Sequence, residues 1–241
     1  MKKNLLKAIS LCLALVLCLG CPIGVSAAEV DDATIDTTAK GSLTIYKYDV
    51  TNAEKDGVWD SSYVSTGVYD QTGVNDVLGG GESTLGNGDT GYGYAIKGVE
   101  FSYVKVADIV QFSESEKDGS TSSHVEVLYG IDKTAGADFL KAIGLSDGAK
   151  RYENADFLEE SKYFYQSDVL IDALEASLEA NSTTVKNALE SYVSANGGAA
   201  MPLTDAYGKT KDENLDLGLY LSVETKVPET VVSTPAPFLV S

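Results

Sequence analysis

Cysteine and histidine are nearly absent from this sequence. Its three cysteines, Cys12, Cys18 and Cys21, all lie near the amino terminus, and His124 is the only histidine. A chain that loses this terminus on export has no thiol, which excludes a disulfide, a cysteine nucleophile and a cysteine metal site. We interpret His124 as a surface residue, because no Gly-x-Ser-x-Gly motif accompanies it and a lone histidine cannot form a zinc site. We therefore expect no metal and no cofactor.

Positive charge is also scarce, since 18 Lys and Arg stand against 36 Asp and Glu, giving a formal net charge of -18. Such a chain is repelled by nucleic-acid phosphate and by anionic membrane surfaces, so neither is expected as a partner. Hydrophobic residues make up 44% and charged residues 22% of the chain, which is an ordinary globular balance. The 23 Gly and 14 Tyr, beside a single Trp, favour strands and turns over a helical bundle.

The sequence lacks an apolar run long enough for a typical membrane span. Its apolar stretch, residues 8–20, follows three lysines and ends shortly before the small residues Val25-Ser26-Ala27. This layout predicts a secretory signal peptide over residues 1–27, and its removal would change the formal net charge to -21. A membrane anchor and a lipid anchor at Cys21 are the alternatives to a cleaved signal peptide.

The rest of the chain divides by its hydrophobic period. Residues 28–40 are polar and read as a flexible lead-in, and residues 41–241 read as the folded domain. Alternating residues predict strands over 42–48, 98–109, 125–129, 217–225 and 238–241, whereas residues 52–93 have the Gly-rich composition of long loops.

A helical period replaces the strand period over about 133–195. Ser167 is expected to cap a helix that stops at Asn181, and Thr183 or Thr184 to cap a second one. Strands on both sides of these helices predict a mainly β, immunoglobulin-like sandwich with a helical insertion.

Three strand segments carry a family resemblance. Residues 41–49 (GSLTIYKYD), 98–106 (GVEFSYVKV) and 218–228 (GLYLSVETKVP) resemble the hallmark strands of Cna B-type domains in Gram-positive pilins. Their order, with the helices between them, resembles the N-terminal domain of a sortase-assembled major pilin, a fimbrial backbone subunit. The resemblance covers nearly all of the chain after the signal peptide. It departs from the family at Ser222, where the family usually has an aliphatic residue.

The resemblance implies a specific internal cross-link. In the family, a first-strand lysine and an asparagine on a late strand form an isopeptide bond, assisted by an acidic residue. Carried over, Lys47 is the amine donor and Glu224 the proton shuttle. Burial favours the neutral amine and the neutral acid, which are the forms that this reaction needs. Lys47 as a residue whose stem covers the core while its ammonium reaches solvent, and Glu224 as a solvent-facing carboxylate, remain open alternatives.

The resemblance also implies where the protein works and with what. We expect a structural subunit of a cell-surface pilus on the cell wall, polymerised by a separate sortase and in contact with neighbouring pilin subunits, and not an enzyme. The family places the acceptor Asn and the sortase-linked Lys after the point that corresponds to Ser241, so we expect the domain over 41–241 to be incomplete at its C-terminal end.

Two other functions fit the composition. A secreted adhesin of similar fold would bind a host surface protein or glycan through the loops of residues 52–93. A secreted glycan hydrolase would use two of the many carboxylates as an acid and base pair.

Overall fold

The computed structural model describes residues 13–15, 35–59, 82–84, 90–115, 123–153, 158–229, 231 and 235–241. The predicted signal peptide, the lead-in and the loops of residues 52–93 lie largely outside these ranges, as does the side chain of His124.

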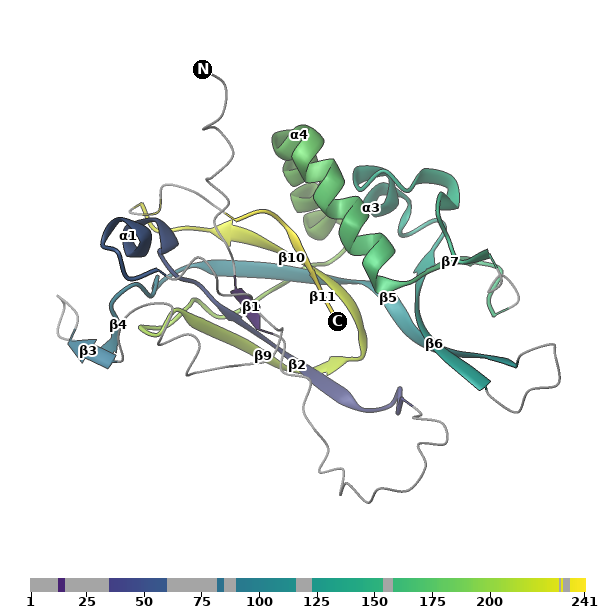
Figure 1. The fold of residues 1–241 in the computed structure, drawn as a ribbon, viewed down its shortest axis with the longest axis horizontal. Helices are drawn as coiled ribbons and strands as arrows, with labels where there is room; N and C mark the ends of the chain where they lie inside the picture. The colour runs from purple at the N-terminus through teal and green to yellow at the C-terminus, as the bar shows by residue number, and fades with distance from the viewer. Residues whose placement is uncertain are drawn as a thin grey trace.

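Two antiparallel sheets build most of the fold (Figure 1). The first has the order β1-β2-β9, and its strands are β1 (Leu13–Leu15), β2 (Lys40–Tyr46) and β9 (Lys209–Asp216). The second has the order β11-β10-β5-β6-β7, with β8 also paired to β5. Its strands are β5 (Glu100–Ser115), β6 (Ser123–Asp132), β7 (Lys162–Tyr165), β8 (Ala199–Ala200), β10 (Gly218–Lys226) and β11 (Phe238–Val240). A separate two-stranded sheet joins β3 (Glu82–Thr84) and β4 (Thr90–Tyr92).

The helices lie mainly between β6 and β8 in sequence. They are α3 (Ala137–Ala142), the short 3-10 helix η1 (Ser146–Gly148) and α4 (Ser167–Ala195), whereas α1 (Val50–Lys55) follows β2. Figure 1 shows α3 and α4 on one side of the sheet that contains β5 and β10, with β2 and β9 on its other side. The molecule therefore has three layers, with β5 and β10 in the middle one.

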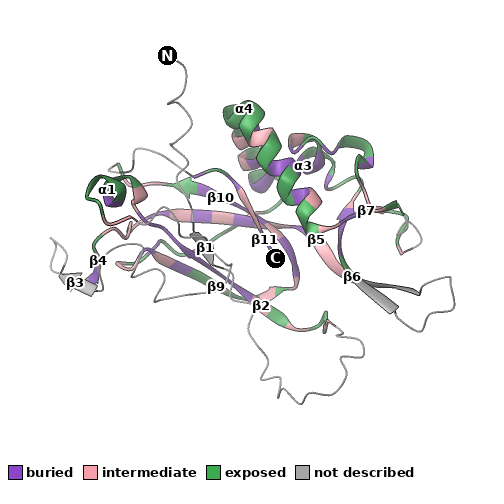
Figure 2. Cartoon of the chain, in the orientation of Figure 1, coloured by how far each residue is buried: buried purple, intermediate pink, exposed green. Residues whose placement is uncertain are grey.

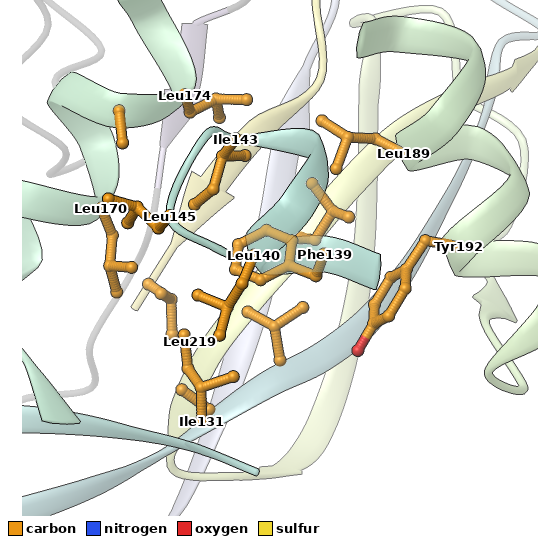
Figure 3. Packing of buried hydrophobic residues seen from close by; sticks show 14 of the residues in the cluster. Ile131, Phe139, Leu140, Ile143, Leu145, Leu170, Leu174, Leu189, Tyr192 and Leu219 are labelled. Atoms are coloured by element: carbon orange, nitrogen blue, oxygen red, sulfur yellow. The ribbon is translucent and has the colours of Figure 1, made fainter. Parts of the chain in front are cut away.

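Each gap between layers holds its own core. Leu219, Leu221 and Val223 of β10 pack against the helices, where Figure 3 shows side chains of α3 and α4 converging. The opposite face of the sheet packs Phe101 and Tyr103 against Leu43, Ile45 and other residues of the β2 layer. In Figure 2 the strands of the middle layer are buried or half-buried over most of their length, and α4 is buried only on the side toward the sheet. The predicted fold class, a mainly β sandwich with a helical insertion, is confirmed.

The regular alternation predicted for β5 breaks at a bulge. Tyr220 pairs with Lys105, but its neighbour Leu219 pairs with Ala107, so Val106 has no partner on β10. Because an extra residue shifts the side-chain period, Val106 and Ala107 both join the core on the helical side. Strict alternation over residues 98–109 would put Ala107 on the face of Phe101 and Tyr103, and the bulge places it on the opposite face.

The break within the long helix lies where it was predicted, but its cap differs. Asn181 has non-helical backbone angles (φ -157°, ψ 75°) inside α4, and its Oδ1 accepts a hydrogen bond from the Thr184 amide at 3.3 Å. Asn181, rather than Thr183 or Thr184, therefore caps the second half of the helix. At the start of α4, Gln166 occupies the cap position and Ser167 is already helical.

Candidate functional site

Lys47 directly follows β2 and inherits the orientation of that strand. Leu43 and Ile45 point into the core between the two sheets, and Lys47 is the next residue on the same face. Its backbone is fixed from two sides, because its N–H donates to the carbonyl of Gly208 at 2.8 Å and its carbonyl accepts from the Ile96 amide at 2.9 Å. The chain thus directs this lysine side chain between the sheets.

Glu224 enters the same space from the middle layer. It lies near the end of β10, where it pairs in register with Phe101 of β5. The residues Leu219, Leu221 and Val223 face the helices, so the alternate residues Tyr220, Ser222 and Glu224 face β2. Both faces of β10 are buried, which is why the alternation alone could not tell whether Glu224 points outward.

The structure brings these two side chains into direct contact. Lys47 Nζ lies 2.9 Å from Glu224 Oε2, and the side chains are 2% and 0% exposed. Within the described part of the chain, neither the ammonium nor the carboxylate has a further hydrogen-bond partner. A pair of charges that is buried without additional donors and acceptors recovers little of its lost hydration. Transfer of one proton from Lys47 to Glu224 would remove both charges from the core.

Burial dominates the protonation of the acid. Loss of water around Glu224 raises the pKa of its carboxyl group above the ordinary value of 4.5, and the nearby Lys47 opposes this shift only in part. The carboxyl group is therefore biased toward its protonated form, which can donate a hydrogen bond or a proton.

Two pairs of aromatic rings pack in the same core, between the middle sheet and β2. Phe101 packs edge to face against Phe238 at a ring-centroid distance of 6.3 Å, and Tyr103 packs in the same manner against Tyr220 at 5.7 Å. Ser222 lies among these residues with 0% exposure, and its hydroxyl has no partner in the described residues. This serine was noted in the sequence only as a departure from an aliphatic position.

A cavity of about 570 Å³ lies at the Lys47 end of the sandwich. It is lined by residues 47–52, Asp56, residues 93–97 and Val231. Its wall includes two carboxylates that are already engaged: Asp49 caps α1 through the Asn52 amide, and Asp56 accepts a hydrogen bond from the Tyr94 hydroxyl at 2.9 Å. Lys47 is among the residues that line this cavity, and Glu224 is not.

The two residues singled out in the sequence thus share one site, although their chemical roles stay predictions. The buried amine of Lys47 does not fit the alternative in which it reaches solvent, and Glu224 is not a solvent-facing carboxylate. Sequence reasoning missed Gly208 and Ile96, which hold the Lys47 backbone. Gly208 could have been suspected from the turn-forming run Asp205-Ala206-Tyr207-Gly208.

Among the described residues, no three or more His, Cys, Asp or Glu side chains gather in a way that could hold a metal ion. No helix in the described ranges is both long and apolar enough to span a membrane.

Comparison with known proteins gives a distant structural likeness. No family model matches the sequence. No curated protein matches it either. A full-length structure of the RrgB pilus protein from Streptococcus pneumoniae is 14% identical over 61% of this chain and 23% of its own, with a TM-score of 0.19. A structure of the pilus backbone RrgB from the same organism is 14% identical over 61% of this chain and 31% of its own, with a TM-score of 0.20. The chain thus spans less than a third of the length of either protein.

Proposed function

We propose that this protein is a structural subunit of a cell-surface pilus and that Lys47 forms an internal isopeptide bond with an asparagine side chain, with Glu224 as the proton shuttle. The observation that carries this proposal is the amine–carboxyl contact of 2.9 Å inside an apolar sandwich. A lysine and a glutamate that served only solubility would lie at the surface, where hydration stabilises their charges.

The geometry suits a condensation that the protein performs on itself. Proton transfer within the pair leaves a neutral amine, which can attack the side-chain carbonyl carbon of the asparagine. Protonated Glu224 donates a hydrogen bond to the carbonyl oxygen and then passes a proton to the departing nitrogen. A C–N bond forms to Lys47, the C–N bond of the carboxamide breaks, and one ammonia leaves. The reaction needs no cofactor and occurs once, so the protein is not an enzyme in the turnover sense.

The proposed bond suits a subunit of a pilus, which must resist mechanical tension. A fibre under tension benefits from a covalent link that closes the domain, and a chain without cysteine after export cannot use a disulfide for it. In this proposal the protein is secreted through its signal peptide, joined to neighbouring pilin subunits by a separate sortase and displayed on the cell wall. In this proposal the folded domain comprises residues 41–241 with its helical insertion.

The intact mass of the exported protein tests the proposal. The protein is produced with the sequence that follows Ser241 in its gene, beside a Lys47→Ala variant and a Glu224→Gln variant. We expect the parent to lack the mass of one ammonia, the Lys47→Ala variant to keep its full calculated mass, and Glu224→Gln to react slowly or not at all. Tandem mass spectrometry of the linked peptides then identifies the asparagine.

The surface exchange Lys40→Ala is a matched control. Lys40 is an exposed lysine at the start of β2, the strand that precedes Lys47, and its side chain forms an ion pair with Asp216. It should lose ammonia as the parent does. A parent that keeps its full calculated mass, although it is folded and exported, would contradict the isopeptide proposal.

A further inference from the structure

Ser222 lies two residues before Glu224 on β10 and carries a buried hydroxyl. The side chain is fully buried, and its Oγ has no hydrogen-bond partner in the described residues. A buried hydroxyl without a partner destabilises the folded state, so alanine or valine would be the more stable choice at this position. Buried polar groups without a hydrogen-bond partner are uncommon in native proteins, so Ser222 is a candidate for a functional role.

The neighbouring polar groups on this face are already satisfied. The Tyr103 hydroxyl donates to Asp212 Oδ2 at 2.6 Å, and the Tyr220 hydroxyl donates to the Asp216 carbonyl at 2.6 Å. Both tyrosines thus direct their polar ends to partners outside the strand, while Ser222, between Tyr220 and Glu224 on the same face, has none. Its hydroxyl is a free donor inside an aromatic enclosure.

The position of Ser222 places this donor on the reaction side of β10. Ser222 and Glu224 are two residues apart on one strand, so their Cα atoms are about 6.5–7 Å apart and their side chains leave the same face. In register, Ser222 pairs with Tyr103 of β5 and Phe238 of β11, which enclose it from both sides. A carboxamide that approaches Lys47 Nζ from the Ser222 side of Glu224 would meet this hydroxyl.

We infer that Ser222 is a second hydrogen-bond donor to the carbonyl oxygen that Lys47 attacks, acting beside Glu224. The inference rests on the proposed function and adds a residue to it. Negative charge develops on that oxygen as the amine adds to the carbonyl carbon, and two donors in a water-free site stabilise the charge more than one. Ser222 keeps its proton throughout, since it only donates a hydrogen bond, and the bonds made and broken are those given above.

The rate of isopeptide formation in Ser222→Ala distinguishes a hydrogen-bond donor to the reacting oxygen from a residue that only fills space. The exchange removes an unsatisfied hydroxyl, so the free energy of unfolding before cross-linking should stay equal or rise. If Ser222 donates to the reacting oxygen, the same exchange should slow isopeptide formation by about 100-fold, the typical loss when one such donor is removed. Ser222→Thr keeps the hydroxyl and should recover most of the rate.

The rate is measured as the fraction of protein that has lost ammonia, by intact mass on samples taken at intervals after synthesis. Ser102→Ala is the matched control, because Ser102 lies on β5 and its hydroxyl contacts Thr225 Oγ1 at 3.1 Å rather than the site. It should react at the parent rate. If Ser222→Ala also reacts at the parent rate, or Ser222→Thr reacts as slowly as Ser222→Ala, the inference is wrong. A parent that never loses ammonia would instead overturn the proposed function.

Discussion

Lys47 and Glu224 lie in contact at a place where neither side chain reaches water. Removal of one member of such a pair leaves an uncompensated polar group in the core, whereas replacement of both by apolar residues restores a uniform interior. The energetic coupling between the two residues is therefore measurable without any knowledge of the cross-link.

We expect Lys47→Met and Glu224→Leu each to lower the free energy of unfolding by about 3 kcal/mol at neutral pH. The double variant should be within about 1 kcal/mol of the parent, because no buried charge remains. Urea unfolding of protein that has not lost ammonia, so that no isopeptide bond contributes, gives the three differences. Losses that simply add up in the double variant would show that the contact contributes no coupling.

The protonation of Glu224 gives a prediction about pH. Its pKa is raised in the folded state, chiefly by burial, so over the range just above 4.5 the folded chain holds a proton that the unfolded chain has released. Stability from the protonated acid is fully present below 4.5 and is lost as the pH rises through the folded-state pKa. Glu224→Gln mimics the neutral acid and does not titrate.

The difference in unfolding free energy between parent and Glu224→Gln should therefore shift in favour of the variant as the pH rises above 4.5. Urea unfolding at a series of pH values between about 4 and 8 measures this trend. The reverse trend, in which the parent gains on the variant as the pH rises, would mean that Lys47 lowers the pKa of Glu224 more than burial raises it.

At the scale of elements, the turn before β9 sets the position of the Lys47 backbone. Gly208 has φ +71°, and a Cβ atom at this residue would lie 2.3 Å from the carbonyl oxygen of Lys47. Gly197, after α4, has a similar φ of +73° with no atom within 4 Å of its Cβ position. The two glycines share the backbone conformation and differ in what surrounds them, so Gly197 is a control for the cost of that conformation.

We expect Gly197→Ala to cost about 1 kcal/mol, the penalty for a side chain in the left-handed region. Gly208→Ala should cost a further ~1–3 kcal/mol, because Lys47 and the turn must move apart. Isopeptide formation should be slowed in Gly208→Ala alone. Thermal or urea unfolding, together with intact mass, measures both effects, and equal losses in the two variants would show that the contact with Lys47 is unimportant.

The sequence predicted the strands and helices in which the spacing of apolar residues follows the spacing of buried side chains. β2, β5 and β10 alternate or are buried on both faces, and the break at Asn181 has an Asn in a position that tolerates a non-helical backbone. β9 reads KTKDENLD and was missed, because it is held by backbone pairing with β2 rather than by apolar side chains. β7 was missed because its four residues lie among segments with a helical period.

The candidate site was predicted only in part for a similar reason. Period-two alternation placed Lys47 on the face of Leu43 and Ile45, but the identity of its partner came from a family resemblance. The contact with Glu224 depends on how two sheets stack, and the residues involved are 177 apart in numbering. Local pattern carries no information about such packing, and it cannot show that Ser222 lacks a hydrogen-bond partner.

At the scale of the whole molecule, three layers leave the middle sheet covered on both sides. The helices cover one face of β5 and β10 and the β2 layer covers the other, so Glu224 is as deeply buried as a core residue although it lies near a strand end. A cross-link at this point would tie the first strand of the domain to its last part.

The proposed cross-link should change global stability in a way that a reducing agent does not affect. A bond that closes a loop of roughly 200 residues stabilises the folded state by about 5 kcal/mol through the lost entropy of the unfolded chain. We expect the cross-linked parent to unfold at a clearly higher temperature than Lys47→Ala. All three cysteines lie within residues 1–27, which the proposed export removes, so dithiothreitol should leave both transitions unchanged. Calorimetry of the two proteins with and without the reductant measures these transitions. If a parent that has demonstrably lost ammonia unfolds at the same temperature as Lys47→Ala, the bond gives no net stabilisation and this prediction is wrong.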